Sequence, residues 1–338
     1  MTIRIDRDNF IGSLEMAVKR RNQAASLGID LARGGVRRLF FVGCGAPNKV
    51  MAVSKYWIEH VAQELEVRLY YPAEFIRLNP PALDDGTLVI LGSDSGATPE
   101  TVEVAEFLSQ RLCITVGITQ ATDSPLAQAV DHPLPYGKSR QGYYARYIAQ
   151  QALVGGLLKE LEGWALHDDV MQALGALPGA LADAMEANEA RAAEEARAYK
   201  DDRVLYLVGA GPCFSTAYVS AVCMLMEMQW MHSHPIEAAE FFHGPFEIVD
   251  ETTPLILLVG EDPSRPVAER VVRFCKRYTE RLMIYDSADF EMKGISKEAR
   301  PLVAPFVVQA ALDRLVEHLA VWHDHPLTTR RYMGKVAY

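Results

Sequence analysis

The sequence predicts an α/β protein made of two consecutive copies of one unit, each with a parallel β-sheet covered by helices on both faces. Residues 38–47 (RLFFVGCGAP) and 204–212 (VLYLVGAGP) are apolar runs of β-forming residues that stop at Gly-x-Gly and lead into helical patterns. A second matching pair, residues 88–92 and 255–260, follows these runs at nearly the same offset. Repetition at half the chain length indicates two α/β units rather than one long domain. Apolar strands that alternate with helices indicate parallel sheets.

The composition is ordinary for a globular protein, with 49% hydrophobic and 23% charged residues in a chain of 338. A formal net charge of −10 argues against sequence-independent binding to nucleic acid or to anionic membranes. No apolar run is long enough to span a bilayer, and the first six residues do not resemble a signal peptide. Five scattered cysteines without a C-x-x-C pair favour reduced thiols in a cytoplasmic protein.

The elements of the first unit can be placed from apolar runs and turn residues. A helix of mixed charge is expected over residues 7–33. Further helices are expected after the glycine turns and from Pro99 onward. The expected strands of this unit are residues 38–43, 67–70, 87–92 and 113–118.

The middle of the chain is rich in alanine and glutamate. Residues 182–191 form a good helical segment, and Pro178 is expected to separate it from the helix before. We interpret this segment as the connector between the two units. The predicted parts are an N-terminal helix (1–34), a first domain (35–165), a helical connector (166–202), a second domain (203–324) and a C-terminal tail (325–338).

The segment after residues 87–92 has the features of a phosphate-binding loop. Ser93, Ser95 and Thr98 place three hydroxyls within six residues, and Gly96 allows close approach of a ligand to the backbone. Thr98 is a candidate helix N-cap, and the free N–H groups of that helix start suit a phosphate. The alternative is a plain Ser-rich turn that caps a helix. In the second unit, residues 261–264 (EDPS) lack these features, so only the first unit is expected to bind an anion.

The first glycine turn does not predict a nucleotide site. Its Gly-x-Gly lacks the third glycine of the dinucleotide fingerprint, and no G-K-[ST] follows it. A small sugar phosphate is therefore the expected ligand, with Gly45 and Ala46 as further candidates for substrate contacts.

Glu227 is the one acid in the apolar helical segment 221–231. Burial there would raise its pKa toward neutrality, as a general base requires. The alternative is a structural glutamate that pairs with an arginine or caps a neighbouring helix. An ion pair away from the substrate would argue against the catalytic role.

A histidine follows at a Gly-Pro turn, in residues 240–247 (EFFHGPFE). There His243 is held by backbone geometry and Pro245 can begin the next helix; a plain surface histidine is the alternative. His232 and His234, with Glu237 or Glu240, could instead suggest a metal. Their spacing fits no tetrahedral pattern, and no metal or other cofactor is expected.

Residues 93–101 (SDSGATPET) resemble the S-x-S-G-x-T-x-E-T signature of the sugar isomerase (SIS) domain. Glu227 and the E-x-x-H-G-P histidine, sixteen residues later, resemble the isomerase half of the glutamine–fructose-6-phosphate aminotransferases. Residues 226–230, 240–247 and the tail 325–333 are most similar to the 6-phosphofructose-aspartate deglycases and, less closely, to the fructoselysine-6-phosphate deglycases. This resemblance covers essentially the whole chain. It implies two tandem SIS domains, each a three-layer αβα sandwich with a parallel five-stranded sheet.

The resemblance also implies a reaction. A 6-phosphofructosyl amino acid (an Amadori product), most closely the aspartate adduct, would be hydrolysed to glucose 6-phosphate and the free amino acid. By the same resemblance Glu227 and His243 are the catalytic pair. The family works as a homodimer with its sites near the subunit interface, where the partner can supply the histidine. The implied phosphate contacts are Ser93, Asp94, Ser95 and Thr98.

Other residues are less directly implied. Pro47 stands where the aminotransferases usually have serine. The deglycases tolerate a proline at this position, so Pro47 favours a deglycase. Lys335 lies near the position of the aminotransferase Schiff-base lysine, although an amine adduct needs no lysine for ring opening. Glu240 is a further candidate for contact with the substrate. Candidates for binding the carboxylates of the amino acid are Arg330, Arg331, Lys138 and Arg140, for which ordinary surface charge is the alternative.

The sequence is also compatible with two other functions. An aldose–ketose isomerase, or an aminotransferase-like phosphosugar isomerase, could use the same base on a free sugar phosphate. A non-catalytic sugar-phosphate sensor could use the same loop without turnover. The acidic charge and the lack of a helix-turn-helix pattern argue against a DNA-binding regulator.

Overall fold

The computed structural model describes residues 3–336 and divides the chain into two compact units. The N-terminal unit comprises residues 7–178 and 294–299, and the C-terminal unit comprises residues 3–6, 179–293 and 300–336. In the described part of the chain, none of the helices combines the length and apolar character that crossing a membrane requires.

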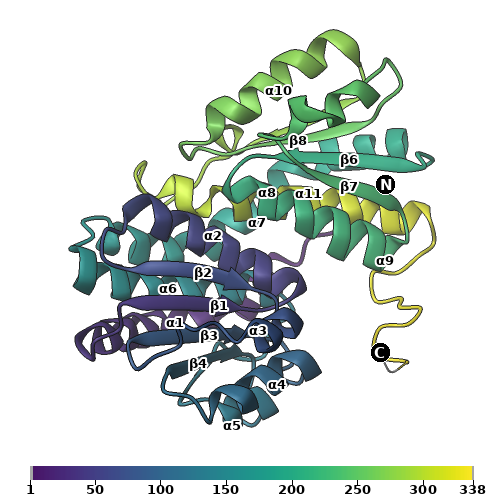
Figure 1. Cartoon of the computed structure of the whole chain (residues 1–338). Coiled ribbons are helices and arrows are strands. Elements are labelled where there is room, and N and C mark those ends of the chain that lie inside the picture. The colour runs from purple at the N-terminus through teal and green to yellow at the C-terminus, as the bar shows by residue number, and fades with distance from the viewer. Residues whose placement is uncertain (1–2, 337–338) are drawn as a thin grey trace. The chain divides into compact units, whose positions relative to one another are not determined.

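The N-terminal unit begins with a 27-residue helix at the predicted position and continues as alternating strands and helices (Figure 1). Its elements are α1 (Arg7–Arg33), β1 (Arg38–Val42), α2 (Gly45–Val61), β2 (Glu66–Tyr70), α3 (Pro72–Leu78), β3 (Thr87–Gly92), α4 (Pro99–Leu108), β4 (Ile114–Thr119), α5 (Pro125–Ala129), β5 (His132–Pro135), α6 (Gly142–Glu162) and the start of α7 (His167–Tyr199). The four expected strands are confirmed within one residue at each end, and β5 adds a fifth.

The five strands form one parallel sheet in the order β2-β1-β3-β4-β5. All six residues of β3 are buried, as its apolar sequence predicted. One face of the sheet packs against α3, α4 and α5 through Phe40, Val89 and Leu108. Glycines let α1 and α6 pack backbone to backbone, because a Cβ on Gly28 would come within 2.1 Å of the Leu153 carbonyl oxygen.

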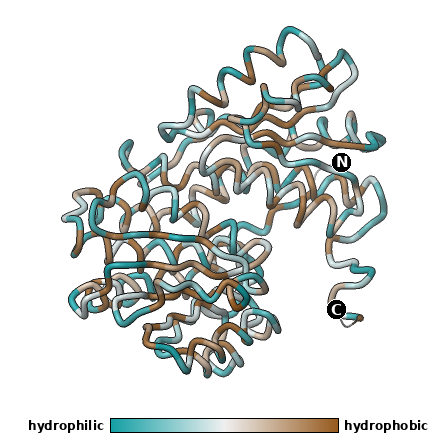
Figure 2. Tube along the Cα trace, viewed as in Figure 1, coloured by the Kyte–Doolittle hydropathy of each residue, from teal (hydrophilic) through white to brown (hydrophobic). Residues whose placement is uncertain are grey.

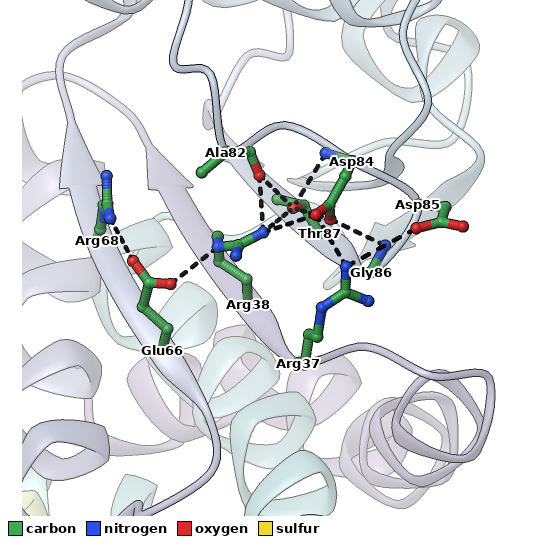
Figure 3. A network of polar contacts seen from close by, with 9 residues as sticks. All are labelled: Arg37, Arg38, Glu66, Arg68, Ala82, Asp84, Asp85, Gly86 and Thr87. Carbon is green, nitrogen blue, oxygen red and sulfur yellow. Dashed lines mark hydrogen bonds and ion pairs between the residues drawn. The ribbon is translucent and has the colours of Figure 1, made fainter.

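A polar network fixes the amino ends of three strands (Figure 3). Arg38, the first residue of β1, donates to Glu66 at the start of β2 (2.9 Å) and to Thr87 at the start of β3 (3.1 Å). The same guanidinium donates to Asp84 (3.2 Å), which also accepts from Arg37 at 2.8 Å. This network leaves the opposite, carboxyl edge of the sheet for the loops that are expected to bind ligand.

The C-terminal unit repeats the architecture with one strand fewer than expected. Its described strands form a parallel four-stranded sheet in the order β7-β6-β8-β9, instead of the five strands that the resemblance implied. Figure 2 shows α10 alternating between teal and brown, as expected for a helix that buries one face against the sheet. The elements are the end of α7, β6 (Val204–Gly209), α8 (Pro212–Tyr218), η1 (Val219–Met226), α9 (Glu227–Gln229), β7 (His232–Glu237), η2 (Phe241–His243), η3 (Pro245–Ile248), β8 (Leu255–Val259), α10 (Arg265–Tyr278), β9 (Leu282–Asp286), η4 (Ser287–Asp289) and α11 (Arg300–Trp322).

The expected break at Pro178 is wrong, since α7 runs unbroken from His167 to Tyr199 with Pro178 inside it. Proline removes one backbone hydrogen bond from a helix. The helix continues because apolar residues on both sides of the proline, including Leu174 and Leu181, are fully buried. The two units nevertheless divide between Pro178 and Gly179.

Candidate active site

The predicted phosphate loop follows β3 at the carboxyl edge of the first sheet. Ser93 is buried, and its hydroxyl accepts the Gly96 N–H at 3.0 Å and lies 2.8 Å from the Thr98 hydroxyl. Exposed Ser95 accepts the Ala97 N–H at 3.2 Å. Thr98 occupies the predicted N-cap of α4, but its side chain makes no capping hydrogen bond. The three hydroxyls therefore lie together at the start of a helix, as an anion site requires.

Gly96 is the conformational centre of this loop. Its φ of +63° lies in the left-handed region that glycine favours. A Cβ at this position would come within 2.2 Å of the Ser124 hydroxyl oxygen. The loop therefore depends on the absence of a side chain at position 96.

Gly45 and Ala46 lie at the same edge of the sheet. They begin the 17-residue helix α2 directly after β1, the neighbour of β3 in the sheet. Their backbone N–H groups belong to the first turn of α2, where helix N–H groups have no intrahelical acceptor. The turn that contains Gly45 and the phosphate loop that contains Gly96 thus follow neighbouring strands, β1 and β3.

Asp94 has a partner that the sequence did not reveal. Its carboxylate is ion-paired with the guanidinium of Arg146, on α6, and accepts a hydrogen bond from the Tyr136 hydroxyl. Arg146 is completely buried, whereas the Asp94 side chain is 41% exposed. The Asp94 carboxylate therefore anchors the loop to α6 through Arg146. The three hydroxyls beside it make no such ion pair. Arg146 lies 52 residues after Asp94 in the chain, and no local sequence pattern links the two residues.

The equivalent turn of the C-terminal unit is occupied by the chain's own carboxylate. Buried Asp262 accepts hydrogen bonds from the Ser264 N–H (2.9 Å) and hydroxyl (2.6 Å). An internal carboxylate in this turn disfavours a second anion, so the asymmetry between the two copies has a structural basis.

Glu227 lies at the end of an unusual helix. Residues Val219–Met226 form a π-helix, η1, and the Glu227 N–H bonds to the carbonyl of Val222, five residues earlier. The helical chain ends at Trp230, which has a φ of 55°. The expected apolar helix is thus present, but as a π-helix, a form often found at functional sites.

Glu227 is less buried than expected and is paired with an arginine. Its side chain is 25% exposed, and its carboxylate lies 2.9 Å from the guanidinium of Arg330. Burial raises the pKa of the Glu227 carboxyl above its ordinary value, and the charge of Arg330 opposes part of this rise. The pKa of Glu227 is therefore raised, as predicted. Glu227 is also paired with an arginine, as the alternative of a structural glutamate predicted.

A cavity of about 780 Å³ opens at this ion pair. The C-terminal tail forms one side of it and runs past the end of α9 (Figure 1). Its lining includes Met226, Glu227, Trp230, Arg330, Arg331 and Met333. The cavity thus combines apolar walls with a few charged groups, as small-molecule sites do.

Side-chain contacts hold the tail in place. Gln229 donates to the His325 carbonyl at 2.8 Å, and the Arg331 guanidinium lies 4.1 Å from the centre of the Trp230 ring. Arg330 donates to the carbonyls of Leu327 (2.8 Å) and Thr329 (2.9 Å). The ammonium of Lys335 donates to the Arg330 carbonyl, so Lys335 supports the tail.

His243 has the local structure that the Gly-Pro turn predicted. It ends the short helix η2, its N–H donates to the Glu240 carbonyl at 2.9 Å, and Pro245 begins η3. His243 and Glu240 are both exposed. Among the described residues, no hydrogen bond or ion pair within one chain joins His243 to Glu227.

The histidines of the alternative metal site do not converge. His232 and His234 are exposed on β7, and His234 stacks on Tyr206. No group of three metal-binding side chains occurs within residues 3–336. Lys138 and Arg140 are exposed between β5 and α6.

Comparisons with known proteins agree with this architecture. A family model described as the SIS domain matches residues 35–152. Fructosamine deglycase FrlB of Bacillus subtilis is 36% identical over 311 residues, covering 91% of this chain and 95% of the relative. Fructoselysine 6-phosphate deglycase of Escherichia coli is 29% identical and covers 90% of this chain and 88% of the relative.

A solved structure extends the similarity to three dimensions. The crystal structure of a candidate phosphosugar isomerase from Bacillus subtilis superposes with a TM-score of 0.90 at 34% identity, over 96% of this chain and all of that one. Similarity of this extent covers most of both α/β units. The chain therefore belongs to the SIS domain family, and its full-length relatives there include fructosamine and fructoselysine 6-phosphate deglycases.

Proposed function

We propose that this protein is a deglycase that hydrolyses a 6-phosphofructosyl amino acid to glucose 6-phosphate and the free amino acid. The observation that carries the proposal is Glu227, a partly buried carboxylate with a raised pKa at the wall of a cavity. Its full-length deglycase relatives support the reaction class. Aspartate is the amino acid that the resemblance of the tail and the second-domain motifs implies.

The chemistry follows from the position of the amine on C1 of the sugar. His243 moves the proton that opens the ring and gives the C2 ketone. Glu227 then removes a proton from C1 while the C2 oxygen gains one, which produces an enaminol. Glu227 returns its proton to C2, giving an iminium at C1. Water adds to C1 and the amine leaves, so glucose 6-phosphate and the amino acid are released.

The phosphate loop contributes binding energy far from the reacting carbons. Three hydroxyls and the start of α4 are proposed to hold the dianion, which adds binding energy to the transition state. The functional protein is proposed to be a homodimer, in which His243 of one subunit completes the site of the other. The exposure of His243 and its lack of a described contact with Glu227 support this arrangement.

Product analysis tests the proposal. The 6-phosphofructosyl adducts of aspartate, lysine and glutamine are offered separately, and glucose 6-phosphate release is coupled to a dehydrogenase. We expect turnover of these adducts, fastest with aspartate, and none of fructose 6-phosphate. Glucose 6-phosphate formed from fructose 6-phosphate would instead indicate an isomerase, and ligand binding without turnover would indicate a sensor.

A further inference from the structure

The charges of the Glu227 cavity point to an anionic part of the ligand other than the phosphate. Among the described residues of its wall, the charged side chains are two arginines and one glutamate. With Glu227 ionised, the wall carries an excess of positive charge, although the whole chain has a net charge of −10. An excess of this sign in a partly apolar cavity favours an incoming carboxylate.

Arg330 is placed to bind that carboxylate. Its Nη1 is committed to the carbonyls of Leu327 and Thr329, which fix the guanidinium in the tail. Its Nη2 points to Glu227 at 2.9 Å, and the two side chains retain exposed fractions of 22% and 25%. The Nη2 edge therefore faces a carboxylate that solvent, and hence a ligand, can reach.

The pairing with Arg330 conflicts with the role of Glu227 as a base. A carboxylate that accepts a charge-assisted hydrogen bond is a weaker base than a free one, and it is held away from any other proton. Catalysis therefore requires Glu227 to leave Arg330. Leaving is unfavourable unless another anion takes its place, because a partly buried guanidinium would otherwise lose its partner.

We infer that Arg330 is the subsite for the α-carboxylate of the substrate's amino-acid part, and that this carboxylate displaces Glu227 from Arg330 and so releases the base. One carboxylate replaces another on the same guanidinium, and the added negative charge offsets the excess positive charge of the cavity wall. Adducts without a carboxylate leave Glu227 paired and react slowly. The inference rests on the proposed deglycase function and adds a specificity-determining residue to it.

The test compares two substrates that differ in one group, 6-phosphofructosyl-glycine and its glycinamide analogue. For the wild-type protein, we expect kcat/KM to be on the order of 100-fold higher with the carboxylate than with the amide. In Arg330→Gln, the carboxylate adduct should lose most of this advantage, while the amide adduct should react faster than in wild type. Arg330→Lys should restore part of the preference, and Arg203→Gln, at an exposed arginine outside the cavity wall, should retain it.

The pH profile gives a readout that a structural role would not change. Without the positive charge of Arg330, the acid limb of kcat/KM should move to higher pH for the amide adduct. If Arg330→Gln slows both adducts equally, or the wild type shows no preference, Arg330 is a structural residue and the inference is wrong. If the wild type releases glucose 6-phosphate from no adduct, the deglycase proposal fails and this inference fails with it.

Discussion

The buried guanidinium of Arg146 is paired with Asp94, a residue of the phosphate loop that is itself 41% exposed. The two partners therefore depend on the ion pair to different degrees. Without Arg146, Asp94 would still be solvated and would keep its hydrogen bond from Tyr136. Without the Asp94 charge, Arg146 would be a buried cation with no counter-ion.

This asymmetry predicts unequal effects on stability. Asp94→Asn should lower the free energy of unfolding by about 3–5 kcal/mol, because it leaves a buried charge unpaired. Arg146→Met, which keeps most of the side-chain volume, should cost clearly less. Urea unfolding of the two variants beside wild type measures the difference, and a larger loss for Arg146→Met would contradict the assignment.

Glu227→Gln tests the base. The substitution keeps the shape of the side chain and its position at the end of η1, but it removes proton transfer. We expect kcat for the phosphofructosyl adduct to fall by about 10²–10⁴-fold while the fold stays intact. Glu247→Gln, an exposed glutamate in the same unit, is the matched control and should stay near wild type. Activity retained within about tenfold, or roughly 1.4 kcal/mol of barrier, would exclude Glu227 as the base.

Gly96→Ala tests the phosphate loop. The new Cβ would meet the Ser124 hydroxyl at 2.2 Å and would occupy a backbone with positive φ. We expect affinity for glucose 6-phosphate to fall by at least about tenfold, or roughly 1.4 kcal/mol. Gly35→Ala is the control, because Gly35 also has a positive φ (+97°) but open space around it. Calorimetric titration measures both affinities. Equal affinities of the two variants for glucose 6-phosphate would show that the loop does not bind the phosphate.

Much of the fold could be read from the sequence because its strands are short apolar runs that end at glycine turns. β1 and β3 begin at the expected residues. The prediction failed at Pro178, where tertiary burial of the surrounding leucines outweighs the local preference of proline. The fifth strand of the second sheet was carried over from a resemblance, and no apolar run in that unit predicted it.

In the site, too, features within a few residues could be predicted, whereas contacts between distant residues could not. The hydroxyls of the phosphate loop lie within six residues, so their grouping could be predicted. The ion pairs Asp94–Arg146 and Glu227–Arg330 join residues far apart in the sequence, and a single sequence carries no signal of such pairs. The π-helical form of η1 was also missed, because its apolar pattern fits an ordinary helix.

Mixed dimers test the proposed contribution of His243 from the partner subunit. Glu227→Gln and His243→Asn should each be inactive alone. When the two variants are unfolded and refolded together, half of the dimers are mixed, and each mixed dimer has one site with both native residues. We expect recovery of roughly a quarter of wild-type activity. If each subunit uses its own Glu227 and His243, every site in the mixture contains one substitution and no activity returns.

The raised pKa of Glu317 predicts that the stability of the protein falls as pH rises toward 7. Burial raises the pKa of its carboxyl to about 7, although nearby Arg314 opposes the rise. Between the ordinary value of 4.5 and about 7, the folded chain holds a proton that the unfolded chain has released. The contribution of this group to stability is therefore fully present at lower pH and is lost as pH rises to about 7. Glu317→Gln stays neutral, so its melting temperature should fall less than that of wild type between about pH 5 and pH 8. Glu280→Gln, an exposed glutamate of the same unit, should follow the wild-type curve, and parallel curves for all three proteins would show that Glu317 does not carry this dependence.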